Sequence, residues 1–457
     1  MTPSFEQTIS AVRFGFGLRQ GDAVPDSPQA IMRGLRDFEP RPGREVADLE
    51  TRGELMSTQR KARDARKKKG GDMEMAEEML DEVRNDYIEM IVNDAQDSFA
   101  TAVDSKSGFF ERLSAFWADH FTVASDNRRL TLMVGDMIRS AIRPHVTTSF
   151  PQMLSAVTKH PAMLIYLNQN RSIGPNSKAG QRRERGLNEN LAREIMELHT
   201  LGVGGGYDQT DVREFAELLT GLATDRDGFE FRPRYAEPGA ERVLGEKYGD
   251  NGPAELADIE EALRDLALHP QTAEHLATKL VVHFIGAPAD PGLVRDMARA
   301  YREAGGQLNP MYRLMLEHES AWSLPLLKAK TPFDFVVSTF RAYGLTGRDI
   351  RQMKTGDFRQ AALLPVTQMG QPFLRPAGPN GWPEEPEAWI TPSNLAARVI
   401  WAHETAQRFA RERDPRAFLD QTLGPIASPQ LSSAVAGAET RFEGVAVVLA
   451  SPEFNRR

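Results

Sequence analysis

The apolar residues of this chain recur mainly at three- and four-residue intervals, the spacing that places them on one face of a helix. A two-residue alternation is clear only within residues 221–252, where FEFRPRYAEPG predicts a short strand or hairpin. The pattern therefore predicts an all-α fold. We expect a single large multi-helix domain over residues 1–457 that includes one small β hairpin.

Two segments stand apart from this pattern. Residues 44–105 are long-helical and highly charged, interrupted once at Gly70 and Gly71, which predicts a charged helical hairpin within the domain. Its first arm is basic and its second is acidic: Arg60, Lys61, Arg63, Arg66, Lys67, Lys68 and Lys69, then Glu74, Glu77, Glu78, Asp81 and Glu82. Contact of the basic run with an anionic surface is the alternative to solvated or paired faces. Residues 370–390 form a loop rich in proline, glycine and tryptophan, and a lid over a pocket is one interpretation.

Most of the candidate chemistry lies in residues 187–221. A helix over 187–201, at about 100° per residue, places an apolar stripe beside a sector that holds Asn190, Glu194 and Glu197, flanked by Arg193. The stripe consists of Leu187, Leu191, Ile195 and Leu198. His199 points roughly opposite the two glutamates, so a Glu/Glu/His metal site would need ligands from another helix. The helix is expected to end at Gly202, and Thr210 or Asp208 then caps a second helix over 211–219.

The polar side of this helix has two interpretations. Glu189, Arg193 and Glu197 have the i, i+4, i+8 spacing of a solvent-exposed ion-pair ladder, which the spacing alone favours. The alternative is a functional pair, Glu194 and Glu197, that binds a divalent ion or divides acid and base roles.

Histidines on two other helices are further candidates. His120 lies on the aromatic face of a helix over 109–121, where a hydrogen-bonded core residue is commoner than a ligand. His275, Lys279 and His283 share one face of a helix over 272–284, and the lysine opposes a shared metal. The loop at 168–186 contains Asn176 and several cations available to an acidic group, although a solvated loop is the commoner outcome.

Composition and missing motifs narrow the classes of function. The formal net charge of −8 gives no basic footprint for nucleic acid, and the absence of cysteine excludes disulfides, thiolate metal sites and cysteine nucleophiles. There is no phosphate-binding glycine loop, no G-x-S-x-G and no H-E-x-x-H. The N-terminus lacks a signal-peptide pattern and no stretch approaches ~20 apolar residues, so we expect a soluble, cytoplasmic chain without a transmembrane segment.

The pattern N-E-N-x-A-R-E-x-x-E-L-H-T-L-G at 188–202, followed by G-G-Y and a helix ending L-T-G, closely resembles the signature of a bacterial family, domain of unknown function 1800. Segments that fit the same family follow one another along nearly the whole chain: RFGFGLRQGD, FWADHFTVAS, HPAMLIYLNQNRSIGPNS, HPQTAEHLATKL and GQPFLRPAGPNGWP. The family has no settled activity. Its members are often encoded beside an exported family, domain of unknown function 1501, which implies a partner of that type and, as the alternative compartment, the periplasm by partner-assisted export.

One position departs from the family pattern. Relatives usually show His-Asp before Pro-Gly, where this chain has Ala236-Glu237. If that histidine is a ligand or general base in relatives, this chain has lost it.

Two functional hypotheses follow. The first is a helical scaffold or accessory protein that acts with a partner, preferred because Ala236 removes a chemical group. The second is a metal-dependent or acid/base enzyme with a helix-borne site. Its catalytic residues would be Glu194, Glu197, His199 and His120; Glu194 and Glu197 would hold a divalent metal ion, and Asn190, Arg193, Asn176 and Trp382 would contact the substrate.

Overall fold

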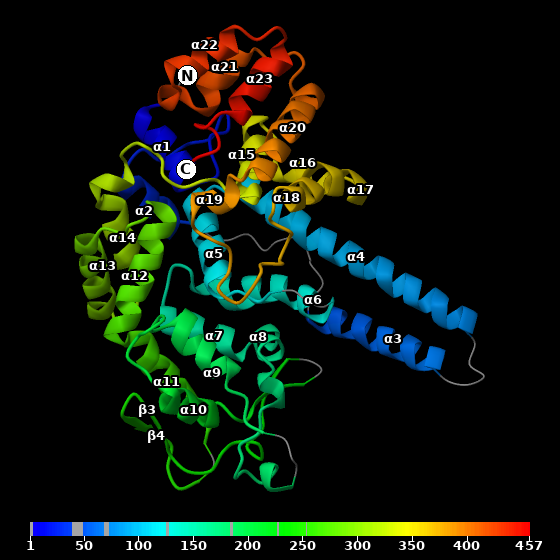
Figure 1. The fold of residues 1–457 in the computed structure, drawn as a ribbon, viewed down its shortest axis with the longest axis vertical. Helices are drawn as coiled ribbons and strands as arrows, with labels where there is room; N and C mark the ends of the chain where they lie inside the picture. Colours follow the sequence, from blue (N-terminus) through cyan, green and yellow to red (C-terminus); the bar gives the residue numbers. More distant parts are fainter. Residues whose placement is uncertain are drawn as a thin grey trace.

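The computed structural model describes residues 3–38, 49–67, 73–124, 128–182, 186–225, 228–252 and 254–457. These residues are mostly helical, so the prediction of an all-α fold is confirmed. Figure 1 shows an elongated molecule with both chain ends near one end and the strands β3 and β4 at the other. None of the helices in the described ranges is both long enough and apolar enough to cross a membrane.

The helices divide along the chain into three groups. The first group runs from the N-terminus through the charged hairpin: α1 Phe5–Arg13, α2 Pro28–Arg36, α3 Leu49–Lys67, α4 Met73–Asp104, α5 Gly108–His120 and α6 Arg128–Met137. The second group forms the central part: α7 Phe150–Lys159, α8 Pro161–Tyr166, α9 Asn190–Glu194, α10 Gln209–Leu218, α11 Leu256–Leu268, α12 Pro270–Phe284, α13 Pro291–Glu303 and α14 Asn309–Glu317. The third group completes the chain: α15 Pro332–Ala342, α16 Gly347–Gln352, α17 Thr355–Phe358, α18 Leu364–Gln368, α19 Pro386–Trp389, α20 Pro392–Phe409, α21 Pro415–Thr422, α22 Pro429–Ala436 and α23 Arg441–Ala450.

Short turns of other helix types complete the set. The wider π form occurs at Ile138–Ile142, Ile195–His199 and Arg359–Leu363. The tighter 3₁₀ form occurs at Arg143–His145, Gln169–Arg171, Gly180–Arg182, Glu319–Ala321 and Gly424–Ile426.

The β structure consists of two small antiparallel hairpins within the described residues, where the sequence predicts one. β1 (Leu222–Thr224) pairs with β2 (Phe229–Phe231), and β3 (Glu241–Val243) pairs with β4 (Glu246–Tyr248). The second hairpin turns through Leu244 and Gly245, whose φ values of 52° and 84° are those of a two-residue turn with both central residues left-handed. The predicted alternation covers only one of the two pairs because FEFRPRYAEPG ends before β3 begins.

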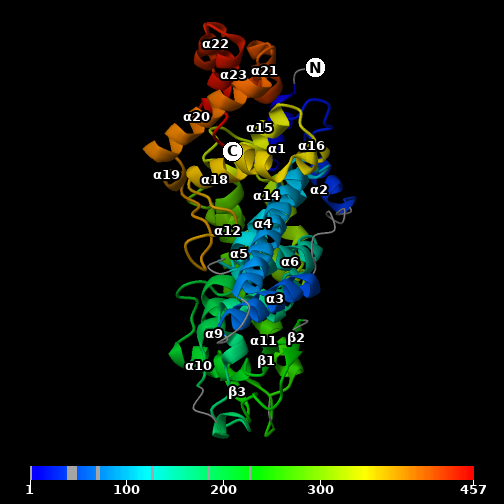
Figure 2. The same ribbon diagram turned by 90° about the vertical axis from the view of Figure 1, so that its right-hand side faces the viewer.

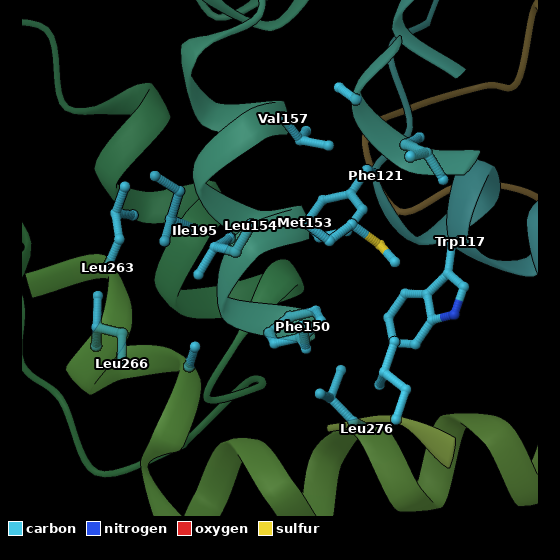
Figure 3. Packing of buried hydrophobic residues seen from close by; sticks show 14 of the residues in the cluster. Trp117, Phe121, Phe150, Met153, Leu154, Val157, Ile195, Leu263, Leu266 and Leu276 are labelled. Atoms are coloured by element: carbon cyan, nitrogen blue, oxygen red, sulfur yellow. The ribbon is translucent and has the colours of Figure 1, made fainter. Parts of the chain in front are cut away.

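The apolar side chains form two large clusters, one built around α5 and α7–α14 and one around the end of α4 and α15–α23. Figure 3 shows part of the first cluster. Phe150, Met153, Leu154 and Val157 follow the i, i+3, i+4, i+7 pattern along α7 and are fully or almost fully buried. They pack with Trp117 and Phe121 of the α5 region and with side chains of α11 and α12.

The predicted helix over 187–201 is shorter than expected and changes its winding. Residues 187–189 are not helical, because the Asn188 side chain accepts a hydrogen bond from the Asn190 N–H at 2.9 Å and donates one to the Leu167 carbonyl oxygen at 3.2 Å. From Ile195 the chain winds as a π turn, which alters which residues face inward. The buried set therefore includes Met196, whereas Leu198 is only partly buried. Asp208, one of the two predicted caps, begins α10 by accepting from the N–H groups of Thr210 and Asp211.

The charged hairpin projects from the body as the paired helices α3 and α4 (Figures 1 and 2). The predicted start at 44–48, the glycine break and Lys68 and Lys69 lie outside the described residues. At the base of the hairpin the Arg52 guanidinium binds both oxygens of Asp94, each at 2.9 Å, and the carbonyl oxygen of Leu132. Arg52 and Asp94 are buried, so this ion pair connects both arms to the adjacent α6.

We expect Arg52→Ala to lower the free energy of unfolding by about 3 kcal/mol, because the buried Asp94 carboxylate then keeps, among the cations of the described ranges, only the longer Arg139 contact at 3.5 Å. Urea denaturation followed by circular dichroism measures this change. The matched control is Arg84→Ala on the same hairpin, where the 3.7 Å pair with Asp81 is exposed and its loss costs less than about 0.5 kcal/mol. Equal effects of the two substitutions would contradict the anchoring role of Arg52.

Candidate functional site

Ionisable side chains from four separate segments meet where α5, α12 and the turn after α9 converge. The end of α5 supplies Asp119 and His120, and the π turn supplies His199. α12 supplies His275, Lys279 and His283, and the loop before α19 supplies Glu384. We refer to these seven residues as the histidine–lysine cluster.

The spacing within α12 explains how three of them share one side. His275, Lys279 and His283 lie four residues apart, so they succeed one another along one face of the helix. α12 begins at Pro270 with His269 as its cap, whose Nδ1 accepts the Gln271 N–H. This defined start fixes which helical face carries the three residues.

Two histidines bind carbonyl groups of the π turn. His120 Nε2 lies 3.1 Å from the carbonyl oxygen of His199, and His275 Nε2 lies 3.2 Å from that of Leu198. Because a carbonyl oxygen only accepts, each Nε2 must carry the proton, and Nδ1 of each neutral ring is an acceptor. His120 Nδ1 is buried and has no hydrogen-bond partner among the described residues. The His120 ring centroid lies 6.0 Å from that of His199 and 6.3 Å from that of His275.

Burial keeps these histidines neutral at physiological pH. It lowers the pKa of His199 to about 3 and that of His275 to about 4, and the nearby Lys279 charge acts in the same direction. Burial and the Lys279 charge also lower the pKa of His120 well below its usual value. Burial also lowers the pKa of Lys279, although the carboxylates of Asp119 and Glu384 oppose that shift.

The Asp119 carboxyl is shifted in the opposite direction. Burial and the neighbouring Glu384 raise its pKa to about 7, against the opposing effects of Lys279 and of the Trp382 N–H. That N–H donates to Asp119 Oδ1 at 2.8 Å. Gly381 precedes it with a φ of +77°, and a Cβ there would lie 2.7 Å from both Asp119 oxygens, so the loop approaches this closely only with glycine.

Glu384 fastens the same loop at a second point. Its carboxylate lies 2.6 Å from His283 Nδ1 and 2.6 Å from Lys328 Nζ. Burial alone would raise the pKa of Glu384, but His283, Lys328 and Arg457 together hold it well below its usual value. Glu384 is therefore a fixed anion, whereas Asp119 gains and loses its proton near neutral pH.

Carboxyl groups and amines with pKa values displaced toward neutrality are characteristic of acid–base catalytic sites. A metal centre suits the cluster less well. In the described part of the chain, the group of carboxylate and imidazole atoms close enough to share one ion is Glu214, Glu217 and Glu241, which lies outside the cluster. Lys279 would also repel a cation.

A family model described as "Protein of unknown function (DUF1800)" matches residues 10–456. The chain belongs to the DUF1800 family. No curated protein and no solved structure matches it. The family description states no activity, so any chemistry of this DUF1800 chain has to be inferred from its own side chains.

Of the residues predicted for the site, His120 and His199 belong to the histidine–lysine cluster, and the backbone N–H of Trp382 donates to its Asp119. Glu194 and Glu197 lie half-buried on another side of the π turn, and burial and Glu197 raise the pKa of Glu194. No interaction within the described ranges joins either glutamate to His120 or His199. The pair of glutamates as a metal site stays a prediction, because no third ligand atom of a described residue completes it.

The remaining predicted residues lie away from the cluster. Arg193 forms half of the predicted ladder, with its guanidinium 3.2 Å from Glu189, and Gln209 bonds to both side chains. Asn190 is exposed. Asn176 donates its backbone and side-chain N–H groups to the carboxylate of Glu237, at distances of 2.6–3.2 Å.

Sequence reasoning missed Asp119 and Glu384 as members of the site. Asp119 lies inside the family segment FWADHFTVAS, beside the predicted His120, and Glu384 follows the segment that ends in GWP. Their position in or next to these family segments was the one sign in the sequence that Asp119 and Glu384 could belong to the site. Their chemical importance comes from burial by the loop, which the spacing of residues does not report.

Asp119→Asn tests the displaced pKa of this carboxyl. The folded state of the DUF1800 chain keeps the Asp119 proton up to about pH 7, whereas the unfolded chain loses it near pH 4, so this group stabilises the fold at low pH and the contribution disappears as pH rises to 7. Asparagine has no such proton. Between about pH 5 and pH 8.5 we therefore expect the variant to gain about 1–3 kcal/mol relative to wild type in the free energy of unfolding.

Chemical denaturation across that pH range measures the difference, and Asp81→Asn, a change at an exposed carboxylate on α4, is the control. Parallel stability curves for wild type and Asp119→Asn would show that the pKa of Asp119 is not displaced.

Proposed function

We propose that this DUF1800 protein is an enzyme that performs acid–base chemistry on a small polar substrate at the histidine–lysine cluster. The observation that carries the proposal is the buried Nδ1 of His120, which has no hydrogen-bond partner among the described residues and lies near His199, His275 and Lys279. Buried polar atoms are almost always hydrogen-bonded, and an exception needs an explanation such as a catalytic or ligand-binding role.

Lys279 adds a second incomplete interaction. Asp119 and Glu384 influence it electrostatically, yet no ion pair within 4.0 Å joins its ammonium to either carboxylate or to another described residue. A purely structural network would satisfy its members, because a partly satisfied buried network costs stability. A polar substrate group such as a hydroxyl would complement both side chains. It would accept a hydrogen bond from the Lys279 ammonium and donate one to His120 Nδ1.

The exposure of its side chains indicates from which side a substrate would reach the histidine–lysine cluster. His120 and His199 are buried, whereas Asp119, Lys279, His275 and Glu384 are only partly buried. A substrate would therefore approach from the side of the Gly370–Trp389 loop and reach Asp119 and Lys279 before the deeper histidines. In this proposal residues 370–390 act as a lid, which is one interpretation of their sequence.

Each group has a role that follows from its charge. Asp119, with a pKa of about 7, donates a proton when protonated and removes one when ionised. The Lys279 ammonium stabilises negative charge that develops on the substrate. His120 and His275 bind polar substrate atoms through neutral Nδ1 acceptors. Glu384, held by His283 and Lys328, positions the loop whose Trp382 N–H orients Asp119.

Lys279→Met separates an enzyme site from a structural network. If the cluster is kept for function, replacing the unpaired, partly buried ammonium of Lys279 with an apolar side chain of similar length should stabilise the fold by about 1 kcal/mol. A structural network should instead lose stability. Urea denaturation at pH 7 distinguishes the two results, with the exposed Lys178→Met as the control for the substitution itself.

Catalysis is tested directly with chromogenic ester, phosphate, amide and glycoside substrates over about pH 5–9. We expect turnover of one class, with a pH profile that reports a group near 7 and a loss of about 100-fold or more in Asp119→Asn and Lys279→Met. Turnover that both variants retain would place the activity elsewhere.

A partner role is the second candidate function, supported by the shape of the hairpin. α3 and α4 project from the body, and Met73 and Met75 near the far end of α4 have 59% and 57% of their surface exposed. Exposed apolar side chains on a projecting element suit a protein contact. The family resemblance implies a partner from the neighbouring domain of unknown function 1501, and export with such a partner would place the protein in the periplasm.

Met73→Glu combined with Met75→Glu should weaken capture of a co-expressed partner of this type by about tenfold or more. Val203→Glu is the control, since Val203 is 80% exposed in the turn before α10, away from the hairpin. Undiminished capture by the double variant would remove this end of the hairpin as the contact surface.

A further inference from the structure

An open cavity of about 1030 Å³ lies beside the loop between α1 and α2, and the end of α4 and the start of α5 form its other walls. The described residues that line it include none of the histidine–lysine cluster. Glu111, which lines the cavity, is on α5 about 12 Å before Asp119. Pockets of this size are typical of small-molecule sites. The cavity is therefore a second candidate site, and it does not depend on the proposed enzyme function.

The glycine-rich loop of the family segment RFGFGLRQGD forms one wall, and two buried arginines hold it in place. Arg112 Nε donates to the carbonyl oxygen of Gly15 at 2.8 Å, and Arg341 Nε donates to that of Gly17 at 3.0 Å. Gly108 approaches the loop so closely that a Cβ there would lie 2.9 Å from Gly15 Cα. These contacts shape the wall independently of any ligand, as is usual for small-molecule pockets.

The charged side chains in the walls neutralise one another. Arg19 lies 2.9 Å from Asp22 and 3.0 Å from Asp104. Asp22 also lies 2.7 Å from Arg341.

A second ion pair closes another part of the lining. Arg143 binds both carboxylate oxygens of Glu111, at 2.5 and 3.0 Å. Of the other charged residues on the lining, Arg351 pairs with Asp97, and the rest are exposed side chains whose charge is screened by solvent: Asp26, Asp37 and Lys106. A charged ligand would have to break these pairs or add an unbalanced charge, whereas an uncharged ligand would not.

The rest of the lining combines apolar side chains with two free hydrogen-bonding groups. The apolar side chains are Ala11, Phe14, Val24, Ile31, Phe38 and Phe109. Ser10 on α1 has only 3% of its surface exposed and lines the cavity, and no described residue bonds to its hydroxyl. Arg19 uses Nε and Nη1 for its two carboxylates, which leaves Nη2 free of bonds to described residues. Both groups can donate to an oxygen of a ligand.

We propose that this cavity binds an uncharged, largely apolar small molecule that carries a hydroxyl or carbonyl oxygen. The apolar body would cover the phenylalanine and aliphatic side chains, because removing such surface from water is favourable. The oxygen would bond to the Ser10 hydroxyl or to Arg19 Nη2. The absence of a net charge would leave the ion pairs of the walls intact.

The test is a fluorescence titration of the full-length protein with three pyrene probes of similar shape. They are the uncharged 1-pyrenemethanol, the anion 1-pyrenecarboxylate and the cation 1-pyrenemethylammonium. We expect the alcohol to bind at least about tenfold more tightly than either ion, because the charges of the walls are already paired. No saturable binding of the alcohol overturns the proposal, as does equal or tighter binding of either ion.

Gly34→Trp tests whether the alcohol binds in this cavity. Gly34 of α2 lines the cavity and a Cβ there meets no atom within 4 Å, so the indole can enter without a clash. We expect affinity for the alcohol to fall at least about tenfold. Gly356→Trp on α17 is the matched control, because a Cβ there is equally unobstructed and Gly356 does not line the cavity. Unchanged binding in Gly34→Trp, or an equal loss in both variants, overturns the proposal.

Ser10→Ala repeats the test from the α1 side, and it removes only the hydroxyl. We expect weaker binding of 1-pyrenemethanol, unchanged binding of unsubstituted pyrene, and an unchanged free energy of unfolding, since no described residue bonds to this hydroxyl. A loss of stability with unchanged binding of the alcohol would make the hydroxyl structural and count against the proposal. Failure of the enzyme proposal would appear separately, because Lys279→Met leaves this cavity intact and should bind the alcohol as wild type does.

Discussion

The architecture depends on neutralising the charge of one buried carboxylate, that of Asp334. This residue lies between the two apolar clusters. Asp334 accepts a hydrogen bond from Arg112 at 3.0 Å and lies 3.3 Å from Arg457 Nε, and all three residues are buried. Burial alone would raise the pKa of Asp334, but the two guanidinium groups hold it below its usual value. Because an isolated charge is too costly to bury, α5, α15 and the segment ending at Arg457 must stay together.

The same interaction fixes the position of the candidate site. Arg112 is on α5, two turns before Asp119 and His120, so its pairing sets the position and rotation of the helix that carries them. Trp117 of α5 also donates to the Tyr312 hydroxyl at 2.7 Å, which in turn donates to the Val146 carbonyl oxygen. Arg457 donates to the carbonyl oxygen of His283 on α12 at 3.0 Å. The two helices that supply most of the histidine–lysine cluster are thus anchored through one network of buried cations.

The sequence pattern correctly predicted those helices and caps that depend on interactions between residues close together in the chain. α5 begins and ends within one residue of the helix predicted over 109–121, and Asp208, one of the two predicted caps, begins α10. The start of α9 was wrong because the side chain of Asn188 binds Leu167, and the π turn was unforeseen because His120 and His275 bind its carbonyl groups from other helices. His120 and His199 were identified from their motifs. Asp119 was not, since its pKa is raised by burial and by Glu384, and the N–H that binds it belongs to Trp382, 263 residues away.

The structure also weakens the argument that Ala236, in place of the family histidine, disfavours an enzyme. Its small side chain was taken to remove a chemical group and therefore to favour a scaffold over an enzyme. Ala236 is buried beside Glu237, whose carboxylate acts electrostatically on Glu217 and Glu241 rather than on the histidine–lysine cluster. All seven residues of that cluster come from other segments, so alanine at 236 subtracts nothing from them. The departure from the family pattern therefore leaves the histidine–lysine cluster unchanged.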